Sequence, residues 1–457
     1  MPNLSWKPKE SGPPDRVILF NRCMKIWSLL LWTVLASAQT PAPRIEVVGP
    51  PLAEDVASSG SRLVAGADGR TYLSWVEVSE ASARLCFARL EPAGWSPART
   101  IAEGSNWMVN WADFPVLAVA RDGSLAATWL ERTGAEGTWD YGVRLAVSAT
   151  GETWSKSVPL HADAAGPEHG FVSLVPLAPQ ASGEAAFGAV WLDSRGSSGG
   201  HEAGSMGLWF RRFVLGADGP ELGPELELDN KTCECCCTSA IVTADGGVEM
   251  AYRDRAEGEL RDIRVVRLGG AALFARGGPL SDGWKIAGCP VNGPALARWK
   301  DTRALVWFTL DQGLGHLGAG TPEPAVKVAL SADGLRFGLP ERVDGGLRAL
   351  AMGRVAATFA EDGRLFVVWL ESAPEASETP MARWMLRQMT GPAGARLAGG
   401  PPVAVALASV EASRASGFGS LVWQAAGPDR AAGAWFAFTR TSEAGPNRVE
   451  TRFVSGL

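Results

Sequence analysis

The segment Tyr72-Leu73-Ser74-Trp75-Val76-Glu77 contains the pattern on which this chain is built: an apolar strand ending in Trp, an apolar residue, then an acid. The pattern returns at intervals of 54 to 62 residues, with Tyr once in place of Trp, and a weaker seventh copy follows. The aromatic positions are Trp75, Trp129, Trp191, Tyr252, Trp307, Trp369 and Trp435. A period of about 60 residues with about four strands per unit is typical of a β-propeller. We therefore predict an all-β propeller of seven four-stranded blades, with six blades as the alternative.

Turns and chain ends support the same prediction. Asp-Gly pairs such as Asp68-Gly69 and Asp362-Gly363 separate the first strand of a unit from its Trp strand, which favours hairpins. The last unit offers three strands only, whereas 44–48 is a lone strand before the first unit. We expect this N-terminal strand to complete the last blade, because pairing would close the ring and cover an edge.

The N-terminal residues are expected to lie outside the propeller. Residues 1–23 are polar and Pro-rich, and we interpret them as an incorrectly assigned start upstream of Met24. The apolar run 26–35 and Ala36-Ser37-Ala38 then predict a cleaved signal peptide over 24–38. The run is too short for a bilayer, which requires about 20 residues, although a retained anchor is the alternative. We therefore expect a secreted or periplasmic protein with one domain over 39–457 and no membrane span after cleavage.

Composition restricts the possible partners. The formal net charge is −6 and no basic stripe is present, which argues against nucleic-acid binding. Gly 54, Pro 30 and Trp 19 describe a turn-rich and aromatic-rich chain, as all-β proteins of this length often are. We expect a monomer.

Several segments resemble sialidase-like propellers, whose repeats are known as BNR repeats or Asp-boxes. Residues 148–154 and 331–337 resemble the Asp-box Ser-x-Asp-x-Gly-x-Thr-Trp, each one residue short. The chain also resembles a bacterial exo-α-sialidase subgroup with a Cys-x-Cys-Cys motif; the matching segments are 168–174, 232–236, 252–255 and 283–294. The resemblance implies a propeller and a secreted glycoside hydrolase. The family's Phe/Tyr-Arg-Ile-Pro motif and its Tyr/Glu nucleophile pair are not found here.

Acids recur two residues after the repeated aromatic, at Glu77, Glu131, Asp193, Asp254 and Glu371. Residues i and i+2 of a strand share a face, so these acids point to one end of the ring. They form either inter-blade ion pairs and turn caps, or a polar mouth. In the second case Asp254 or Asp193 is the expected acid/base of a glycoside hydrolase, with Arg255 and Arg261 as anion-binding groups.

Polar residues also stand where the first strands begin. His169, Asn292, Arg354 and Asp113 come from four units, and first strands line the channel of a propeller. With Arg255 and Arg261 they predict an axial mouth for a carbohydrate or a small anionic ligand. Water-filled channel lining is the alternative.

Cysteines cluster at one place in the chain. Cys233, Cys235, Cys236 and Cys237 open unit 4, and Cys289 opens the neighbouring unit. In an oxidising compartment a disulfide between Cys289 and a cluster cysteine is expected; a thiolate site for Cu or Zn is the alternative. Two functions therefore stay open: a secreted propeller that binds or hydrolyses carbohydrate, and a non-catalytic periplasmic propeller that binds a ligand, metal ion or protein partner.

Overall fold

The computed structural model describes residues 43–457 except 136–137, 164–167, 196–205, 270–273, 312–321, 346–349, 374–378, 429 and 442–444. The expected mistaken start and the signal peptide lie outside the described residues. Within the described part of the chain, no helix has the length and apolar character needed to cross a membrane.

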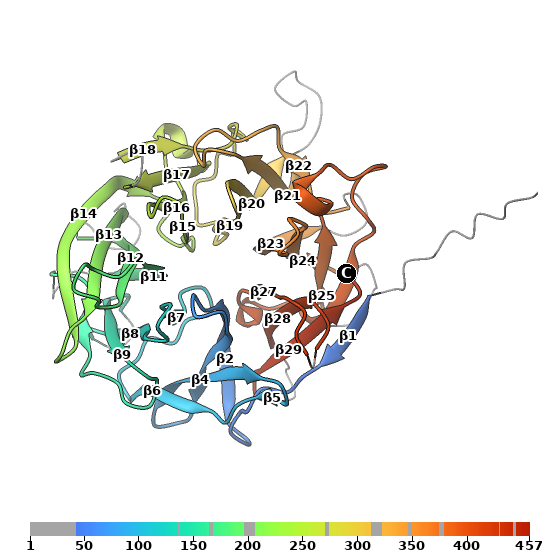
Figure 1. Ribbon diagram of the computed structural model, residues 1–457. Helices are drawn as coiled ribbons and strands as arrows, with labels where there is room; N and C mark the ends of the chain where they lie inside the picture. The colour runs from blue at the N-terminus through green and yellow to red at the C-terminus, as the bar shows by residue number, and fades with distance from the viewer. Residues whose placement is uncertain are drawn as a thin grey trace, which may run out of the picture. The chain divides into compact units, whose positions relative to one another are not determined.

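Residues 43–457 form seven antiparallel sheets around a common axis, as predicted (Figure 1). Blades 1 and 2 contain β2 (Ala57–Ala65), β3 (Thr71–Val78), β4 (Ala83–Glu91), β5 (Gly94–Trp95) and β6 (Arg99–Gly104), then β7 (Val116–Val119), β8 (Leu125–Arg132), β9 (Tyr141–Ser148) and β10 (Val158–Pro159). Blades 3 and 4 contain β11 (His169–Leu177), β12 (Ala186–Asp193), β13 (Met206–Leu215) and β14 (Pro220–Thr232), then β15 (Ser239–Val242), β16 (Val248–Arg253), β17 (Ile263–Leu268) and β18 (Phe274–Gly277).

The remaining blades follow the same order from the axis outwards. Blades 5 and 6 contain β19 (Ala295–Trp299), β20 (Thr302–Asp311), β21 (Glu323–Ser331) and β22 (Glu341–Arg342), then β23 (Ala351–Phe359), β24 (Leu365–Ser372), β25 (Met381–Gln388) and β26 (Val405–Glu411). Blade 7 contains β27 (Ser420–Gln424), β28 (Gly433–Arg440), β29 (Arg448–Ser455) and β1 (Arg44–Val47). The innermost strands contact one another in cyclic order, and β27 meets β2.

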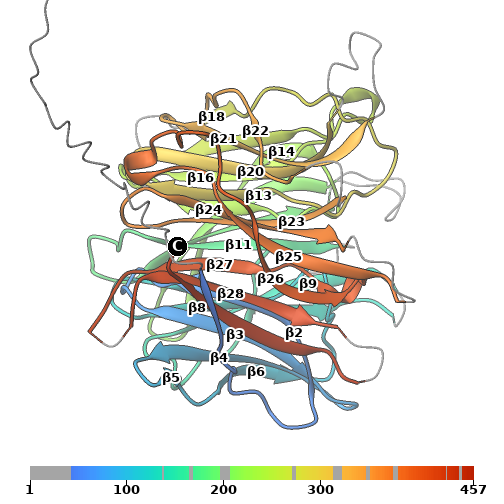
Figure 2. The same ribbon diagram turned by 90° about the vertical axis from the view of Figure 1, so that its right-hand side faces the viewer.

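Ring closure occurs as the sequence predicts. Strand β1 pairs with β29 in antiparallel register, Arg44 opposite Ser455 and Val47 opposite Arg452. The four side chains of β1 are exposed, so this strand is held mainly by its backbone ladder. It covers the edge that β29 would otherwise present to solvent. Figure 2 shows the propeller from its side, where the chain ends of blade 7 face the viewer.

The recurring Trp–acid pattern has a structural role. Trp75, Trp191 and Trp369 are fully buried. Their indole Nε1 atoms donate to Glu77 (3.0 Å), Asp193 (2.8 Å) and Glu371 (2.9 Å), the acid two residues later in each case. A buried N–H left unpaired would cost about 1–3 kcal/mol. Arg84 and Arg383 on the third strands pair with Glu77 and Glu371 in turn. These ion pairs lie within a blade, not between blades.

Candidate functional site

A cavity of about 960 Å³ runs along the axis and is lined by the innermost strands of all seven blades. This volume lies near the upper end of the range of about 300–1,000 Å³ typical of small-molecule sites. At one end its lining includes Arg62, Phe114 and Phe418; at the other it reaches Trp299 and Trp423.

The end at which the inner strands begin is packed with aromatic and cationic side chains. The Arg62 guanidinium lies 4.6 Å from the centre of the Phe114 ring. Trp111 stacks on Phe418 at 6.3 Å, and Arg354 lies 5.1 Å from Trp111. Residues from blades 1, 2, 6 and 7 therefore fill the place where the sequence predicts a polar mouth.

Three of the predicted ligand-binding residues connect neighbouring blades here. Asp113 Oδ1 accepts from Phe171 N at 2.8 Å, which joins blades 2 and 3. Asn292 Oδ1 accepts from Arg354 N, also at 2.8 Å, which joins blades 5 and 6. Arg354 Nη1 then donates to Ser416 Oγ at 2.6 Å and to the Gly417 carbonyl at 2.9 Å, reaching blade 7. Their role toward a ligand stays a prediction.

Asp113 has an unusual electrostatic environment. Its Oδ2 lies 3.0 Å from Tyr141 Oη, which donates to Glu168 at 2.6 Å. Burial, together with the charge of Glu168, raises the pKa of Asp113 to about 8. A carboxylic acid in this position is protonated at neutral pH. Sequence reasoning assigned Tyr141 no role, because nothing in its neighbours along the chain shows the two acids around it.

Two axial arginines lack a carboxylate partner among the described residues. Arg354 contacts only hydroxyl and carbonyl oxygens and aromatic rings, and burial lowers its pKa to about 10. Arg62 lines the cavity beside Phe114, and burial lowers its pKa as well. A guanidinium withdrawn from water without a counter-ion is costly unless an anion joins it. Arg62 was not predicted as a site residue, because it lies inside a first strand and away from any motif.

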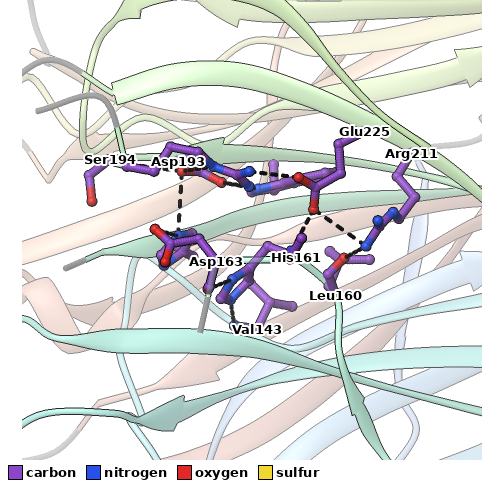
Figure 3. Close-up of polar contacts among 12 residues, drawn as sticks. Val143, Leu160, His161, Asp163, Asp193, Ser194, Arg211 and Glu225 are labelled. Atoms are coloured by element: carbon purple, nitrogen blue, oxygen red, sulfur yellow. Dashed lines mark hydrogen bonds and ion pairs between the residues drawn. The ribbon is translucent and has the colours of Figure 1, made fainter. Parts of the chain in front are cut away.

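Asp193 belongs to a buried cluster between blades 2 and 3 (Figure 3). His169, also buried, lies beside it. Asp193 accepts from Arg195 Nη2 at 2.6 Å and from Trp191, and His169 Nε2 lies 3.4 Å from its Oδ1. Burial would raise the pKa of Asp193, but hydrogen bonds from His169 and Arg195 outweigh it and hold the pKa well below its usual range. Asp193 is thus a poor proton donor near neutral pH.

His161 lies parallel to His169 with ring centres 3.7 Å apart. Its Nε2 accepts from Val143 N at 3.2 Å, so its Nδ1 carries the proton and donates to the Asp163 carbonyl at 2.5 Å. Burial, with His169 beside it, lowers the pKa of His161 to about 4. Glu225 and Arg211, also drawn in Figure 3, lie 3.4 Å apart, and Arg211 donates to the Leu160 carbonyl at 2.5 Å.

Asp254, Arg255 and Arg261 lie in a second ionic cluster. Glu234 binds Arg255, and its other oxygen accepts from Arg261 at 3.0 Å. Glu259 also pairs with both arginines, at 3.1 and 2.8 Å. Burial and the nearby Asp229 raise the pKa of Asp254. Arg255 and Arg261 therefore lie together, as expected, but both are paired with Glu234 and Glu259.

The cysteine cluster is the densest group of soft ligand atoms in the described residues. The Sγ atoms of Cys233, Cys235 and Cys236 all lie within 4.8 Å of one another. Cys289 lies near Cys235; a disulfide or metal site that joins the two segments stays a prediction. The three clustered thiols carry no disulfide in the structure.

No family model matches the chain, and no curated protein matches it in sequence. Among solved structures, the BP39L lectin from Burkholderia pseudomallei is 12% identical over 86% of this chain and 97% of that one, with a TM-score of 0.49. A point mutant of the NanB sialidase from Streptococcus pneumoniae is 7% identical over 90% and 94%, with a TM-score of 0.41. A protein of unknown function from Dyadobacter fermentans is 12% identical over 91% and 99%, with a TM-score of 0.41. Membership in the exo-α-sialidase subgroup stays a prediction.

Proposed function

We propose that this protein is an exported propeller that binds an acidic carbohydrate in its axial cavity. The observation that supports this most directly is Arg62, a guanidinium that lines the cavity with no carboxylate partner among the described residues. A guanidinium matches a carboxylate with two parallel hydrogen bonds. The Phe114 ring supports the flat side of Arg62 and holds it in place for such a ligand.

Aromatic groups at the other end of the cavity fit a sugar. Trp299 and Trp423 both line it and are half-buried. Each indole N–H is fixed by Glu361: Trp299 Nε1 donates to its carbonyl at 2.9 Å, and Trp423 Nε1 to its carboxylate. Aromatic rings held in this way offer an apolar surface with polar groups beside it, which suits the mixed surface of a pyranose.

Binding is favoured over hydrolysis by the position of the acids. Within the described residues, the carboxylates that line the cavity are Asp113 and Glu361. Both have hydrogen-bond partners of their own, whereas Asp193 and Asp254 lie outside the lining. The proposal that the protein is exported rests on the apolar segment and cleavage pattern within 24–38.

Calorimetric titration with matched acidic and neutral sugars tests the proposal. We expect acidic sugars to bind more tightly, and Arg62→Ala to weaken them at least 10-fold while leaving neutral sugars little changed. Trp299→Ala should weaken both classes, and Trp139→Ala, at an exposed site outside the cavity lining, should weaken neither. Equal binding of acidic sugars by wild type and Arg62→Ala would contradict the assignment. Turnover of a glycoside reporter, lost in Asp254→Asn, would establish hydrolysis instead.

A further inference from the structure

The loop between β14 and β15 presents three thiols to one point. Cys233 Sγ lies 2.9 Å from Cys236 Sγ and 3.9 Å from Cys235 Sγ. Two thiolates that bind one metal ion at about 2.3 Å are separated by about 3.8–4.0 Å, depending on the coordination angle. The Cys233–Cys235 separation has this value, whereas Cys236 Sγ would have to move about 1 Å away from Cys233 Sγ to bind the same ion.

The loop is fixed at both ends. Cys233 N donates to the Arg253 carbonyl at 2.9 Å, and Thr232 Oγ1 donates to the Met206 carbonyl at 2.9 Å. At the far end Thr238 Oγ1 donates to the Phe171 carbonyl at 2.8 Å. Cys233 and Cys236 are at most 1% exposed. The three sulfurs are thus held together before any ion binds, which lowers the entropy cost of binding.

The charges around the loop favour thiolates. Arg253 is 1% exposed, and its guanidinium donates to the carbonyls of Asn292, Arg261 and Phe308 at 2.5–2.9 Å. No carboxylate among the described residues pairs with it. In the sequence repeat this position is apolar in every other blade, for example Val76 and Leu370. A buried cation that replaces an apolar residue requires a buried anion nearby.

Arg261, 2% exposed, also lies near Cys233, but it is already paired with Glu234 and Glu259. Thiolates are the form in which cysteine binds metals.

We propose that Cys233, Cys235 and Cys236 bind one thiophilic d10 metal ion, monovalent copper or zinc, with Arg253 balancing part of the charge of the thiolates. A set of sulfur ligands alone selects such ions over the harder cations that prefer oxygen. Three thiolates suffice for monovalent copper, whereas zinc requires a fourth ligand. Cys289, in reach of Cys235, supplies that ligand in the zinc case. The site lies outside the axial lining, to which only Cys237 of the cluster contributes, so it is independent of the proposed function.

Cys86 and Cys237 provide matched controls within the same chain. Cys86 lies alone in blade 1, and Cys237 Sγ donates to the Ala112 carbonyl at 3.1 Å. The reduced protein is titrated anaerobically with monovalent copper and with zinc, each in competition with a chromophoric chelator. We expect one ion per chain and at least a 100-fold loss of affinity in Cys233→Ser, Cys235→Ser and Cys236→Ser. Cys86→Ser and Cys237→Ser should bind as wild type does. Cys289→Ser should weaken zinc but not copper.

A second measurement uses the wild-type protein and does not depend on the folding of any variant. Alkylation followed by mass spectrometry should show Cys233, Cys235 and Cys236 protected by the ion, while the reactivity of Cys86 and Cys237 is unchanged by it. The proposal is wrong if neither metal competes with the chelator, or if the three thiols are alkylated equally with and without metal. The proposal is also wrong if Cys233 and Cys236 form a stable disulfide and the protein binds no metal after that disulfide is reduced.

Discussion

Two junctions between blades have the same geometry but differ in charge. Between blades 2 and 3, Asp113 accepts from the backbone of Phe171; between blades 5 and 6, Asn292 accepts from the backbone of Arg354. Both distances are 2.8 Å, and both donor residues have a positive φ, 54° and 55°. A glycine precedes each donor. The fold thus requires a short side-chain acceptor and a left-handed residue at this position.

The fold does not require a charge at this position. Asn292 supplies the acceptor as a neutral amide, and its Nδ2 donates to the carbonyls of Pro290 and Met352. Asp113 supplies it from a carboxyl group whose pKa burial raises to about 8. The carboxyl group is therefore less favourable for folding than an amide would be. It also lines the axial cavity, where Asn292 does not.

Replacing the glycine at either junction should have the largest effect on the free energy of unfolding. A Cβ at Gly353 would lie 2.3 Å from Asn292 Oδ1 at a φ of +84°, and one at Gly170 would lie 1.8 Å from Asp113 Oδ2. We expect Gly353→Ala to reduce the free energy of unfolding by about 3–5 kcal/mol, and Gly170→Ala by about 2–3 kcal/mol. Chemical denaturation measures both.

Gly183 is the control for these substitutions, because its φ is +99° but nothing lies near its would-be Cβ. Gly183→Ala should cost about 1 kcal/mol from backbone strain alone. If all three variants lost the same amount, the contact with the acceptor would not be the cause.

Placing a carboxyl group at the Asn292 junction, as at the Asp113 junction, should have an intermediate effect on the free energy of unfolding. In Asn292→Asp a carboxylate oxygen would face the carbonyls of Pro290 and Met352 in place of an amide N–H. We expect a loss of about 2–3 kcal/mol at pH 8. The loss should be smaller at pH 4, because burial raises the pKa of the new carboxyl group and protonation restores a donor. Equal losses at the two pH values would show that charge is not responsible.

Removing the charge from the Asp113 junction should have the smallest effect, and a favourable one. The pKa of Asp113 is about 8 in the folded protein against a usual value of 3.8. Between these values the folded state binds more protons than the unfolded state, so this residue's contribution to stability falls as pH rises from about 4 to about 8. In Asp113→Asn, Oδ1 still accepts from Phe171 N while Nδ2 donates to Tyr141 Oη.

We therefore expect Asp113→Asn to be more stable than wild type at pH 8, by at least about 1 kcal/mol, and nearly equal to it at pH 4. Denaturation at several pH values measures the difference between the two proteins, which isolates this group from others that titrate. A difference that does not change with pH would contradict the assigned pKa.

The sequence alone did not predict how the residues of the candidate sites are paired or ionised. Asp193 and Asp254 are recognisable as members of a repeat, but hydrogen bonds from His169 and Arg195 decide that Asp193 stays ionised. Arg62 has no motif around it, and only the structure shows that no carboxylate among the described residues pairs with it. Arg253 could have been singled out, because it is a charged residue at a position that is apolar in the other repeats.

The sequence by itself predicted the order of the strands and the closure by β1, and it favoured seven blades over six. These follow from local regularities: a spacing between tryptophans, Asp-Gly turns, and one strand left over at each end. The tertiary structure alone decided which side chains are paired. Axial and inter-blade contacts join residues up to hundreds of positions apart, as when Leu63 N donates to Ser420 Oγ at 2.8 Å. Burial and nearby charge act through space, so the ionisation of Asp113 appears only once the ring is formed.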